Sequence, residues 1–569
     1  MERDSAVISF RNYSFQYHSQ AEPTLHDIDL DIYSGEKILI LGPSGSGKST
    51  LGNCINGLIP FAYKGEIQGS LRVAGLEAAQ QGIFALSKHV GTVLQDPDGQ
   101  FVGLTAGEDI AFALENDKVP FADMHERVRR AAAMVGMEKW LLSSPYELSG
   151  GQKQRTSLAG VLVNDVDVLL FDEPLANLDP ATGMAAIEII DDIHRSANKT
   201  IIIIEHRLED VLHRHVDRII VMNDGRIVAD MDADCLMCSD VLVANGIREP
   251  LYITALKYAR VPLTPALRPG RIDTLDIGAC ADALRRWMSG VGPPSSAADD
   301  DTVLSLEDIG FSYDPRHKAL DGVGFSIKRG EMISVIGRNG AGKSTLTKLL
   351  CGFYKPDEGM IRYEGNDIAD KTISERAQYI GLVMQNPNQM ISETMIAKEV
   401  GLGLKLRGVG QDEIDERLKD TLSVCGLAPF FEWPISALSF GQKKRVTVAS
   451  ILILRPRVLI LDEPTAGQDY RHYTEIMRFL RQLNQSGVTV ILITHDMHLM
   501  LEYAPRAVVL SGGRLICDAP ASQVLTDDAV IKEANLKETS LYTLAKRCGL
   551  DAAVFVQAFI DYETRVQAK

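Results

Sequence analysis

Two stretches of this chain show the same succession of apolar and polar positions. In the first, an apolar run over residues 38–41 predicts a buried strand, a glycine-rich loop follows, and Leu51, Ile55 and Leu58 then share one face of a predicted helix. In the second, an apolar run over residues 333–336 also comes directly before a glycine-rich loop. The pattern predicts strand, loop and helix in this order, twice, in an α/β chain.

Two further patterns surround these stretches. Residues 7–33 alternate apolar and polar positions, which predicts half-buried antiparallel strands ahead of the first loop. Apolar residues at helical spacing, such as Ile110 and Leu114, predict an α-helical insert over about residues 97–148. The repeat predicts a corresponding insert over about residues 387–438.

The repeat divides the 569 residues into two large halves. We expect a first domain with a C-terminal tail over residues 1–290 and a second domain with its own tail over residues 302–569. Residues 289–302, SGVGPPSSAADDDT, have the Pro, Ser, Ala and Asp content of a solvated linker.

The composition is that of an ordinary globular protein, with 45% hydrophobic and 24% charged residues. A net charge of −17 argues against a nucleic-acid partner, because binding to phosphate backbones requires a basic surface. No apolar run approaches the ~18 residues that span a bilayer, and the first residues lack the apolar stretch of a signal peptide. We therefore expect a cytoplasmic protein, alone or attached to a membrane through a partner.

Cysteine usage adds little to this prediction. The eight cysteines are scattered, which is typical of thiols in a reducing compartment. Cys235 and Cys238 form a single CxxC, and no second pair follows at the spacing of a zinc site.

The first glycine-rich loop, GPSGSGKST, has the composition that phosphate binding requires. Its glycines let backbone amides surround a phosphate, Lys48 places a positive charge on the β- and γ-oxygens, and the Ser49 hydroxyl is a ligand for Mg²⁺. The alternative is a chance match in a turn, and the second loop, GRNGAGKST, argues against it. The residues expected to bind nucleotide are Gly42, Ser44, Gly45, Gly47, Lys48, Ser49 and Thr50, and Gly337, Asn339, Gly340, Gly342, Lys343, Ser344 and Thr345.

Each half also has an apolar strand that ends in two acids, Asp172 and Glu173 in the first half and Asp462 and Glu463 in the second. An acid at the end of a buried strand beside a phosphate site is placed to hold Mg²⁺. The next acid can take a proton from an attacking water.

Four more polar residues stand at strand ends and recur at about the same offset. These are Gln95 and Gln385, and His206 and His495. Taken singly, such a Gln is usually a loop residue and such a His is usually structural. The recurrence weakens that interpretation for the glutamines.

The motif LSGGQKQR begins a predicted helix that an anion could approach. Ser149 can cap the helix, and Gly150 and Gly151 leave its first amides open. The second half has LSFGQKKR, in which Phe440 stands in place of a glycine. The residues expected to contact nucleotide are Ser149, Gly150, Gly151 and Gln152, and Ser439, Gly441 and Gln442.

Tyr17 and Tyr313 lie at similar distances before the two phosphate loops. Either ring could stack on an adenine, and the alternative is a cross-strand aromatic pair. The repeat favours stacking.

Together these motifs resemble those of ATP-binding cassette (ABC) ATPases, twice, in family order and over nearly the whole chain. The resemblance implies two tandem ABC nucleotide-binding domains, each a P-loop RecA-like α/β core with an antiparallel β subdomain and an α-helical insert. It implies binding and hydrolysis of ATP with Mg²⁺. It also implies that the P-loop of one cassette and the signature motif of the other enclose each ATP, here within one chain.

The resemblance also carries roles for single residues. It implies that Tyr17 and Tyr313 stack on adenine, that Lys48 and Lys343 are the Walker A lysines, and that Gln95 and Gln385 are Q-loop glutamines that touch Mg²⁺ and water. It implies that Asp172 and Asp462 are the Walker B acids and that Glu173 and Glu463 are the catalytic glutamates. It also implies that His206 and His495 are the switch histidines and that Asp179 and Asp469 are the D-loop acids.

Within the superfamily, residues 95–112, QDPDGQFVGLTAGEDIAF, are similar to the corresponding stretch of energy-coupling factor (ECF) ATPases. Those proteins serve vitamin and metal uptake in prokaryotes. The resemblance implies two partners, an integral-membrane coupling protein and a small membrane-embedded substrate-binding protein, and a peripheral place on the cytoplasmic face of the membrane. The tails from Ala244 and Glu533 match each other and are either interface segments or packed terminal helices.

Two alternatives share the twin-cassette organisation. One is a soluble ATPase that acts on ribosomes or nucleic acid, which typically carries a long basic linker where this chain has a short acidic one. The other is the ATPase of another importer class, such as the sugar importers.

Two expectations concern differences within the chain. Because Phe440 replaces a glycine near the phosphate, we expect the Lys48 site to turn over more slowly than the Lys343 site. Apolar residues after the Q-loops, among them Phe101, Val102, Met390 and Ile391, either form a docking groove for a membrane partner or pack into the insert.

Overall fold

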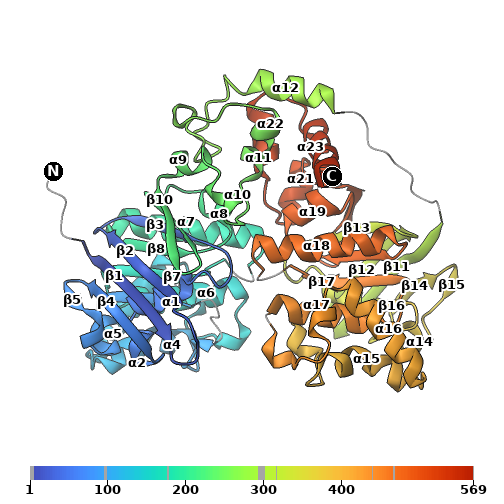
Figure 1. Ribbon diagram of the computed structural model, residues 1–569, viewed down its shortest axis with the longest axis horizontal. Helices are drawn as coiled ribbons and strands as arrows, with labels where there is room; N and C mark the ends of the chain where they lie inside the picture. Colours follow the sequence, from blue (N-terminus) through green and yellow to red (C-terminus); the bar gives the residue numbers. More distant parts are fainter. Residues whose placement is uncertain are drawn as a thin grey trace. The chain divides into compact units, whose positions relative to one another are not determined.

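The computed structural model describes residues 6–94, 99–175, 178–291, 301–314, 317–438, 440–465 and 468–567. These residues form two compact units, Met1–Cys280 and Ala281–Lys569, called unit 1 and unit 2 below. Each unit contains a mixed six-stranded sheet, an antiparallel four-stranded sheet and a group of helices (Figure 1). The predicted α/β class is confirmed.

The central sheet of unit 1 has the strand order β10-β9-β3-β8-β7-β6. Its inner strands are parallel, and β10 pairs with β9 in the antiparallel sense. Every residue of β3 and β8 is buried, as expected of apolar strands covered on both faces. The strands are β3 (Lys37–Leu41), β6 (Val90–Val93), β7 (Val168–Asp172), β8 (Thr200–Ile204), β9 (Arg218–Asn223) and β10 (Arg226–Met231).

The alternating N-terminal segment of unit 1 forms the antiparallel sheet, in the order β2-β1-β4-β5. Its inward side chains, among them Phe10, Phe15 and Leu30, share one apolar core with β3 and α1 (Lys48–Ile55). This core fixes the phosphate loop between two sheets. The strands are β1 (Ile8–Tyr17), β2 (Leu25–Ile32), β4 (Gly65–Val73) and β5 (Leu76–Glu77).

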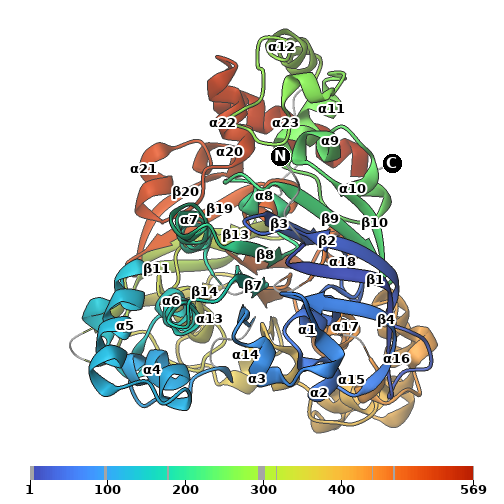
Figure 2. The ribbon, with the colours of Figure 1, turned by 90° about the vertical axis from the view of Figure 1, so that its left-hand side faces the viewer.

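The helical insert of unit 1 consists of α4 (Ala106–Asn116), α5 (Phe121–Met134) and α6 (Gly150–Leu162). Thr105 and Glu108 form a capping box at the start of α4, which fixes where that helix begins. Figure 2 shows these helices at one side of unit 1 and strands β1, β2 and β4 at the other. The remaining helices are α2 (Leu58–Phe61), α3 (Ile83–Leu86), α7 (Pro180–Ala197), α8 (Leu208–Val211), α9 (Ala233–Met237), α10 (Val241–Ala244) and α11 (Leu251–Tyr258).

Unit 2 repeats this architecture. Its central sheet has the order β16-β17-β18-β13-β19-β20, and its antiparallel sheet has the order β12-β11-β14-β15. The strands are β11 (Thr302–Asp314), β12 (His317–Lys328), β13 (Met332–Ile336), β14 (Glu358–Tyr363), β15 (Asn366–Asp367), β16 (Ile380–Val383), β17 (Val458–Asp462), β18 (Thr489–Ile493), β19 (Arg506–Ser511) and β20 (Arg514–Pro520).

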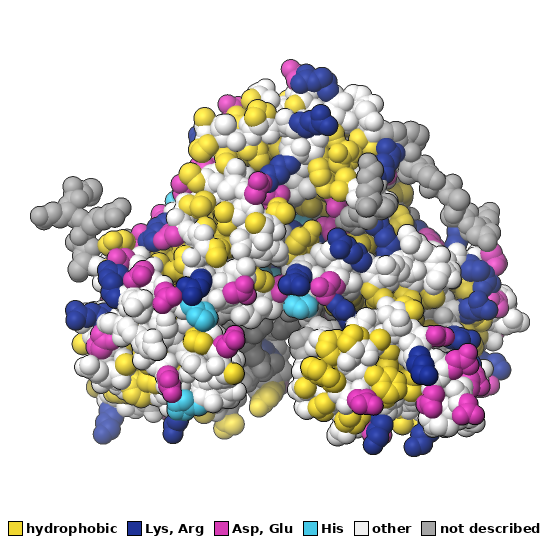
Figure 3. All heavy atoms as spheres, viewed as in Figure 1, with side chains coloured by type: hydrophobic (Ala, Val, Ile, Leu, Met, Phe, Trp, Pro, Cys, Tyr) yellow, Lys and Arg dark blue, Asp and Glu magenta, His cyan; other side chains and the backbone are white. Residues whose placement is uncertain are grey.

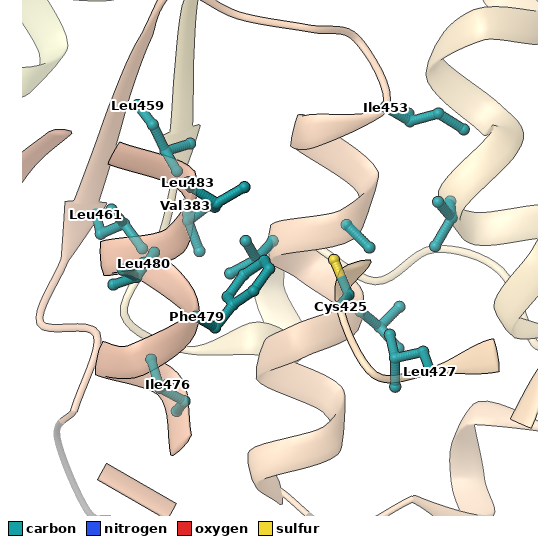
Figure 4. Packing of buried hydrophobic residues seen from close by; sticks show 14 of the residues in the cluster. Val383, Cys425, Leu427, Ile453, Leu459, Leu461, Ile476, Phe479, Leu480 and Leu483 are labelled. Atoms are coloured by element: carbon teal, nitrogen blue, oxygen red, sulfur yellow. The ribbon is translucent and has the colours of Figure 1, made fainter. Parts of the chain in front are cut away.

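The helices of unit 2 pack on the central sheet and form its insert. Leu480 and Leu483 of α18 belong to the same buried cluster as Leu459 and Leu461 of β17 (Figure 4). The helices are α13 (Lys343–Leu350), α14 (Ile373–Arg376), α15 (Ile396–Leu406), α16 (Gln411–Val424), α17 (Phe440–Leu452), α18 (Tyr470–Gln485), α19 (Met497–Tyr503), α20 (Ala521–Val524), α21 (Asp528–Glu533), α22 (Ser540–Arg547) and α23 (Ala552–Gln567).

Helix α12 (Ala281–Gly290) lies within the range expected for the first domain, but it belongs to unit 2. Its Trp287 ring centroid lies 5.9 Å from that of Phe555 and 5.6 Å from that of Tyr562, both on α23. Arg285 donates a hydrogen bond of 3.1 Å to the carbonyl of Cys548. The apolar face of α12 therefore packs on the C-terminal helices (Figure 1).

Among the helices of the described residues, none is both long enough and apolar enough to cross a membrane.

Candidate nucleotide-binding sites

The two phosphate loops share two glycines with left-handed backbone conformation. Gly45 and Gly47 have φ of 80° and 94°, and Gly340 and Gly342 have φ of 80° and 103°, values at which a side chain is strained. A Cβ on Gly42 would lie 2.4 Å from the carbonyl oxygen of Met222, so this position also requires glycine. The predicted glycines therefore let each loop curl back over its strand.

Each loop lysine folds across its own loop. Lys48 Nζ donates to the carbonyls of Gly42 and Pro43 at 2.8 and 2.9 Å. Lys343 Nζ donates to the carbonyl of Gly337 at 2.6 Å and to that of Arg338 at 3.1 Å. Both ammonium groups thus lie where a phosphate enclosed by the loop would meet them.

A hydroxyl and a carboxylate adjoin the loop in unit 1. Ser49 Oγ donates to Asp172 Oδ1 at 3.3 Å. Burial raises the pKa of the Asp172 carboxyl, and the bond from Ser49 opposes that rise. In unit 2, burial and then the charge of Glu463 raise the pKa of Asp462. A buried carboxyl of this kind favours a nearby cation.

These residues fit a magnesium ion that is completed by its nucleotide. Mg²⁺ prefers oxygen ligands and is commonly held by one or two carboxylates together with substrate phosphates. The described residues contain no group of three or more His, Cys, Asp or Glu side chains that could hold a metal alone. The Ser49 hydroxyl and the Asp172 carboxylate are oxygen donors, the ligand type that Mg²⁺ prefers.

The predicted catalytic glutamates occupy strained backbone positions. Glu173 has φ of 50° and Glu463 has φ of 45°, and each backbone amide donates at 2.8 Å to the end of the neighbouring strand. Such conformations in non-glycine residues cluster at functional sites.

The surroundings of the two predicted switch histidines differ between the units. In unit 2, His495 Nδ1 lies 2.6 Å from Glu463 Oε1. In unit 1, His206 Nδ1 lies 3.9 Å from Glu173 Oε1 and 3.3 Å from Glu205 Oε2. Burial raises the pKa of Glu173, the charge of His206 opposes this and the charge of Glu205 adds to it.

Sequence reasoning missed Glu205. Its side chain is fully buried, directly after a strand that is otherwise apolar. Its position is that of Thr494 in unit 2. The signal available in the sequence was the difference between the two strand ends, IIIIEH with a glutamate and VILITH with a threonine at the same position.

The Q-loop of unit 2 is held by a second missed residue, Lys444. Its buried ammonium donates to the carbonyls of Met384 and Gln385 at 2.9 and 2.7 Å, and burial lowers the pKa of Lys444 to about 8. The corresponding residue of unit 1 is Gln154, whose amide donates to the carbonyl of Pro174. Gln95 lies outside the described residues.

The signature segment of unit 1 begins a helix, as predicted. Ser149 and Gln152 form a capping box, in which the Ser149 amide donates to Gln152 Oε1 at 2.8 Å. A Cβ on Gly150 would meet nothing within 4 Å, so the helix start is open on that side. In unit 2, Phe440 is the first residue of α17, and Ser439 lies outside the described residues.

The D-loop acids have a local structural role. Asp179 caps α7 by accepting from the Thr182 amide at 3.0 Å, and Asp469 caps α18 by accepting from the His472 amide at 2.9 Å. Each cap fixes the start of the helix that follows the strand with the predicted catalytic glutamate at its end.

The two predicted adenine-stacking rings stand beside the loop helices. The Tyr17 hydroxyl lies 3.2 Å from Thr50 Oγ1, and the Tyr313 hydroxyl lies 3.2 Å from Thr345 Oγ1. Each ring also meets a phenylalanine of its own strand edge to face. Tyr313 keeps 52% of its surface exposed, so its ring remains accessible to a ligand.

The apolar segments after the Q-loops differ in exposure. Val102 and Leu104 of unit 1 are 65% and 82% exposed. Met390 and Ile391 of unit 2 pack against the buried cluster of their insert, which is the alternative interpretation of these residues. The insert of unit 2 exposes other hydrophobic side chains, and Figure 3 shows hydrophobic side chains gathered over α15 and α17. Exposed hydrophobic residues of this insert include Leu406, Val424 and Trp433.

Comparisons with protein families match both units. The family model for ABC transporters matches residues 25–176 and 320–466. A model described as an ATP-binding cassette cobalt transporter matches residues 239–311. A third model, for an AAA domain, overlaps the second cassette over residues 431–502.

Curated relatives match the chain from end to end. A Clostridium perfringens protein named "Putative ABC transporter ATP-binding protein" is 55% identical over 564 residues, with 99% of each chain covered. A protein of the same description from Enterococcus faecalis is 56% identical over 565 residues, again with 99% of each covered.

Among solved structures, cbiO1 from Clostridium perfringens is described as part of the ABC transporter complex cbiONQ. It is 35% identical, covers 42% of this chain and 95% of its own, and superposes with a TM-score of 0.39.

Proposed function

The chain belongs to the family of ABC transporter ATP-binding proteins and is an ATPase coupled to transport, and from this premise we propose that it energises an ECF-type importer of a vitamin or a metal ion. The observation that carries the proposal is the match of residues 239–311 to a model described as an ATP-binding cassette cobalt transporter. The sequence of residues 95–112, which resembles the corresponding stretch of ECF ATPases, supports the proposal.

Each proposed site uses one phosphate loop and the strand ends beside it. The loop amides and Lys48 bind the phosphates of one ATP, and those around Lys343 bind the other. Ser49 with Asp172, and Ser344 with Asp462 and Gln385, would hold Mg²⁺, which neutralises phosphate charge; Gln95 would act likewise in unit 1.

The remaining residues act on the attacking water and on closure. Glu173 and Glu463 accept a proton from the water, and His206 and His495 hold that water and the γ-phosphate in line. By resemblance, the segment Ser149 to Gln152 completes the Lys343 site, and Ser439, Gly441 and Gln442 complete the Lys48 site. ATP binding then closes the cassettes and hydrolysis reopens them.

We propose that the partners are an integral-membrane coupling protein and a small membrane-embedded substrate-binding protein. The chain would then sit peripherally on the cytoplasmic face of the membrane. The exposed Val102 and Leu104, at the junction of the Q-loop with the insert of unit 1, are apolar side chains suited to receive a short helix of the coupling protein.

Affinity purification of the chain from membranes of its own cell tests this function. We expect two membrane proteins to copurify, with a vitamin or metal ion retained by the smaller one. Val102→Glu should release the chain from membranes while ATP binding persists. Val243→Glu is a matched control, because Val243 is 60% exposed on α10 of unit 1. Sedimentation of the wild-type chain with ribosomes instead of membranes would overturn the proposal.

A further inference from the structure

The strands that lead to the two switch histidines end in different residues. In unit 1, β8 is followed by Glu205 and His206, and in unit 2, β18 is followed by Thr494 and His495. The Glu205 amide donates to the carbonyl of Ile40 at 3.1 Å, and the Thr494 amide makes the equivalent bond to the β13 strand at 3.3 Å. The backbones thus take the same course, and both side chains are fully buried. The difference lies in the side chain alone.

In unit 2 the threonine supports the catalytic glutamate. Thr494 Oγ1 donates to Glu463 Oε2 at 3.3 Å, while His495 Nδ1 lies 2.6 Å from Glu463 Oε1. The same threonine oxygen accepts from the Asp496 amide at 3.0 Å. Each oxygen of Glu463 therefore has a partner, and one of these partners is the histidine.

In unit 1, Glu205 accepts hydrogen bonds from the neighbouring backbone amides. Glu205 Oε1 accepts from the Leu175 amide at 3.1 Å, and Oε2 accepts from the amides of His206 and Arg207 at 2.7 and 3.3 Å. The His206 ring lies closer to Glu205 than to Glu173, with Nδ1 at 3.3 Å from Glu205 Oε2 and 3.9 Å from Glu173 Oε1.

A carboxylate at the position of Glu205 and Thr494 has the opposite hydrogen-bonding character from a hydroxyl. A threonine hydroxyl donates a hydrogen bond to the catalytic glutamate, whereas an ionised glutamate can only accept. Glu205 therefore competes with Glu173 for the imidazole. In unit 2, Thr494 and His495 instead both bind Glu463.

We propose that Glu205 is a positioning residue that draws His206 away from Glu173 and makes the Lys48 site the slower of the two. This inference rests on the proposed roles of the two glutamates and the two histidines. A displacement of about 1 Å from the productive geometry can cost on the order of 100-fold in rate. The difference between the two histidine–glutamate distances, 3.9 against 2.6 Å, is of that size.

The test isolates each site in the full chain. In a Glu463→Gln background, hydrolysis of labelled ATP under single-turnover conditions reports the Lys48 site. We expect Glu205→Thr to raise the rate there by roughly 10- to 100-fold, with the ATP concentration for half-maximal rate unchanged. In a Glu173→Gln background, the reciprocal Thr494→Glu should lower the rate of the Lys343 site by a similar factor.

A histidine-dependent control separates positioning from a structural role. In a His206→Ala background, Glu205→Thr should no longer raise the rate, since the imidazole it would release is absent. A rate gain that persists without His206, or the absence of any gain with it, overturns the proposal. Should Glu205→Thr fail to fold, Thr494→Glu decides alone, and an unchanged rate in that variant contradicts the proposal.

Failure of the underlying function has a different signature. The double variant Glu173→Gln with Glu463→Gln should be inactive. Native hydrolysis in that double variant would remove the base assignments themselves, whereas an inactive double variant combined with an unresponsive Glu205→Thr would overturn only the role of Glu205.

Discussion

The two cassettes of this chain share their phosphate loops and differ where the attacking water would be held. Lys48 and Lys343 bond to equivalent carbonyls of their loops. The strand ends beside them diverge, because Glu205 faces His206 in unit 1 and Thr494 faces Glu463 in unit 2. In the proposed mechanism, the residues that bind phosphate are therefore arranged alike in the two units, and the residues around the attacking water are arranged differently. The difference lies outside the motifs that define the two proposed sites.

The largest expected difference concerns the two glutamates that we propose to be catalytic, Glu173 and Glu463. Removing a positioned base costs about 10² to 10⁴ in rate at its own site. Because the Lys343 site is the faster one in this account, Glu463→Gln should remove most of the steady-state ATPase activity and Glu173→Gln should remove less. Phosphate release by the purified chain measures both. Native rates in both single variants would contradict the assignment.

A second difference concerns the buried core. Lys37 of β3 pairs with Asp191 of α7 at 2.7 Å, with side chains 1% and 4% exposed, whereas β13 begins with the apolar Met332. Burial lowers the pKa of Lys37, and its bond to Asp191 opposes this. Asp191→Ala should lower the free energy of unfolding of unit 1 by about 3–5 kcal/mol, because a buried ammonium loses its partner.

Denaturant unfolding followed by far-UV circular dichroism measures this cost. Asp165→Asn is the control, since Asp165 pairs with Lys199 at the same 2.7 Å but is 86% exposed, and asparagine tolerates its φ of 52°. It should cost about 0–1 kcal/mol. Equal costs in the two variants would show that burial does not decide the value of the pair.

A third and smaller difference lies in the Q-loop of unit 2. Lys444→Gln gives unit 2 the residue of unit 1 and removes the ammonium from the carbonyls of Met384 and Gln385. Loss of these bonds should lower the local stability of the Q-loop by about 1–3 kcal/mol. Hydrogen exchange measures this change as faster exchange of the amides around residues 384–386. Lys443→Gln, one residue earlier on α17, should leave this exchange unchanged. Unchanged exchange in Lys444→Gln would show that the Q-loop is held by other contacts.

Much of the fold was predictable from local patterns. The apolar runs 38–41 and 333–336 are strands β3 and β13, and the alternating residues 7–33 form β1 and β2. Those elements have continuous apolar or alternating sequences, since parallel strands are buried on both faces and antiparallel ones on one. The association of α12 with unit 2 was not predictable, because it depends on contacts with residues more than 250 positions away, such as Cys548.

The positions of the candidate-site residues were predictable where a motif is short, and two neighbouring residues were missed because their contacts are distant in sequence. Asp172, Glu173 and their counterparts stand at strand ends that a sequence pattern identifies. Glu205 and Lys444 have their effect through residues that are distant in sequence, Leu175 and Met384 among them. A comparison of the two halves, residue by residue, would have singled out both positions.

The direct test of unequal sites is to disable one phosphate loop at a time. Lys48→Ala and Lys343→Ala remove equivalent ammonium groups from equivalent loops. Steady-state ATPase rates of the two variants are compared with that of the wild-type chain. The account predicts the larger loss for Lys343→Ala, because that variant removes the faster site. Equal losses, or a larger loss for Lys48→Ala, would contradict it.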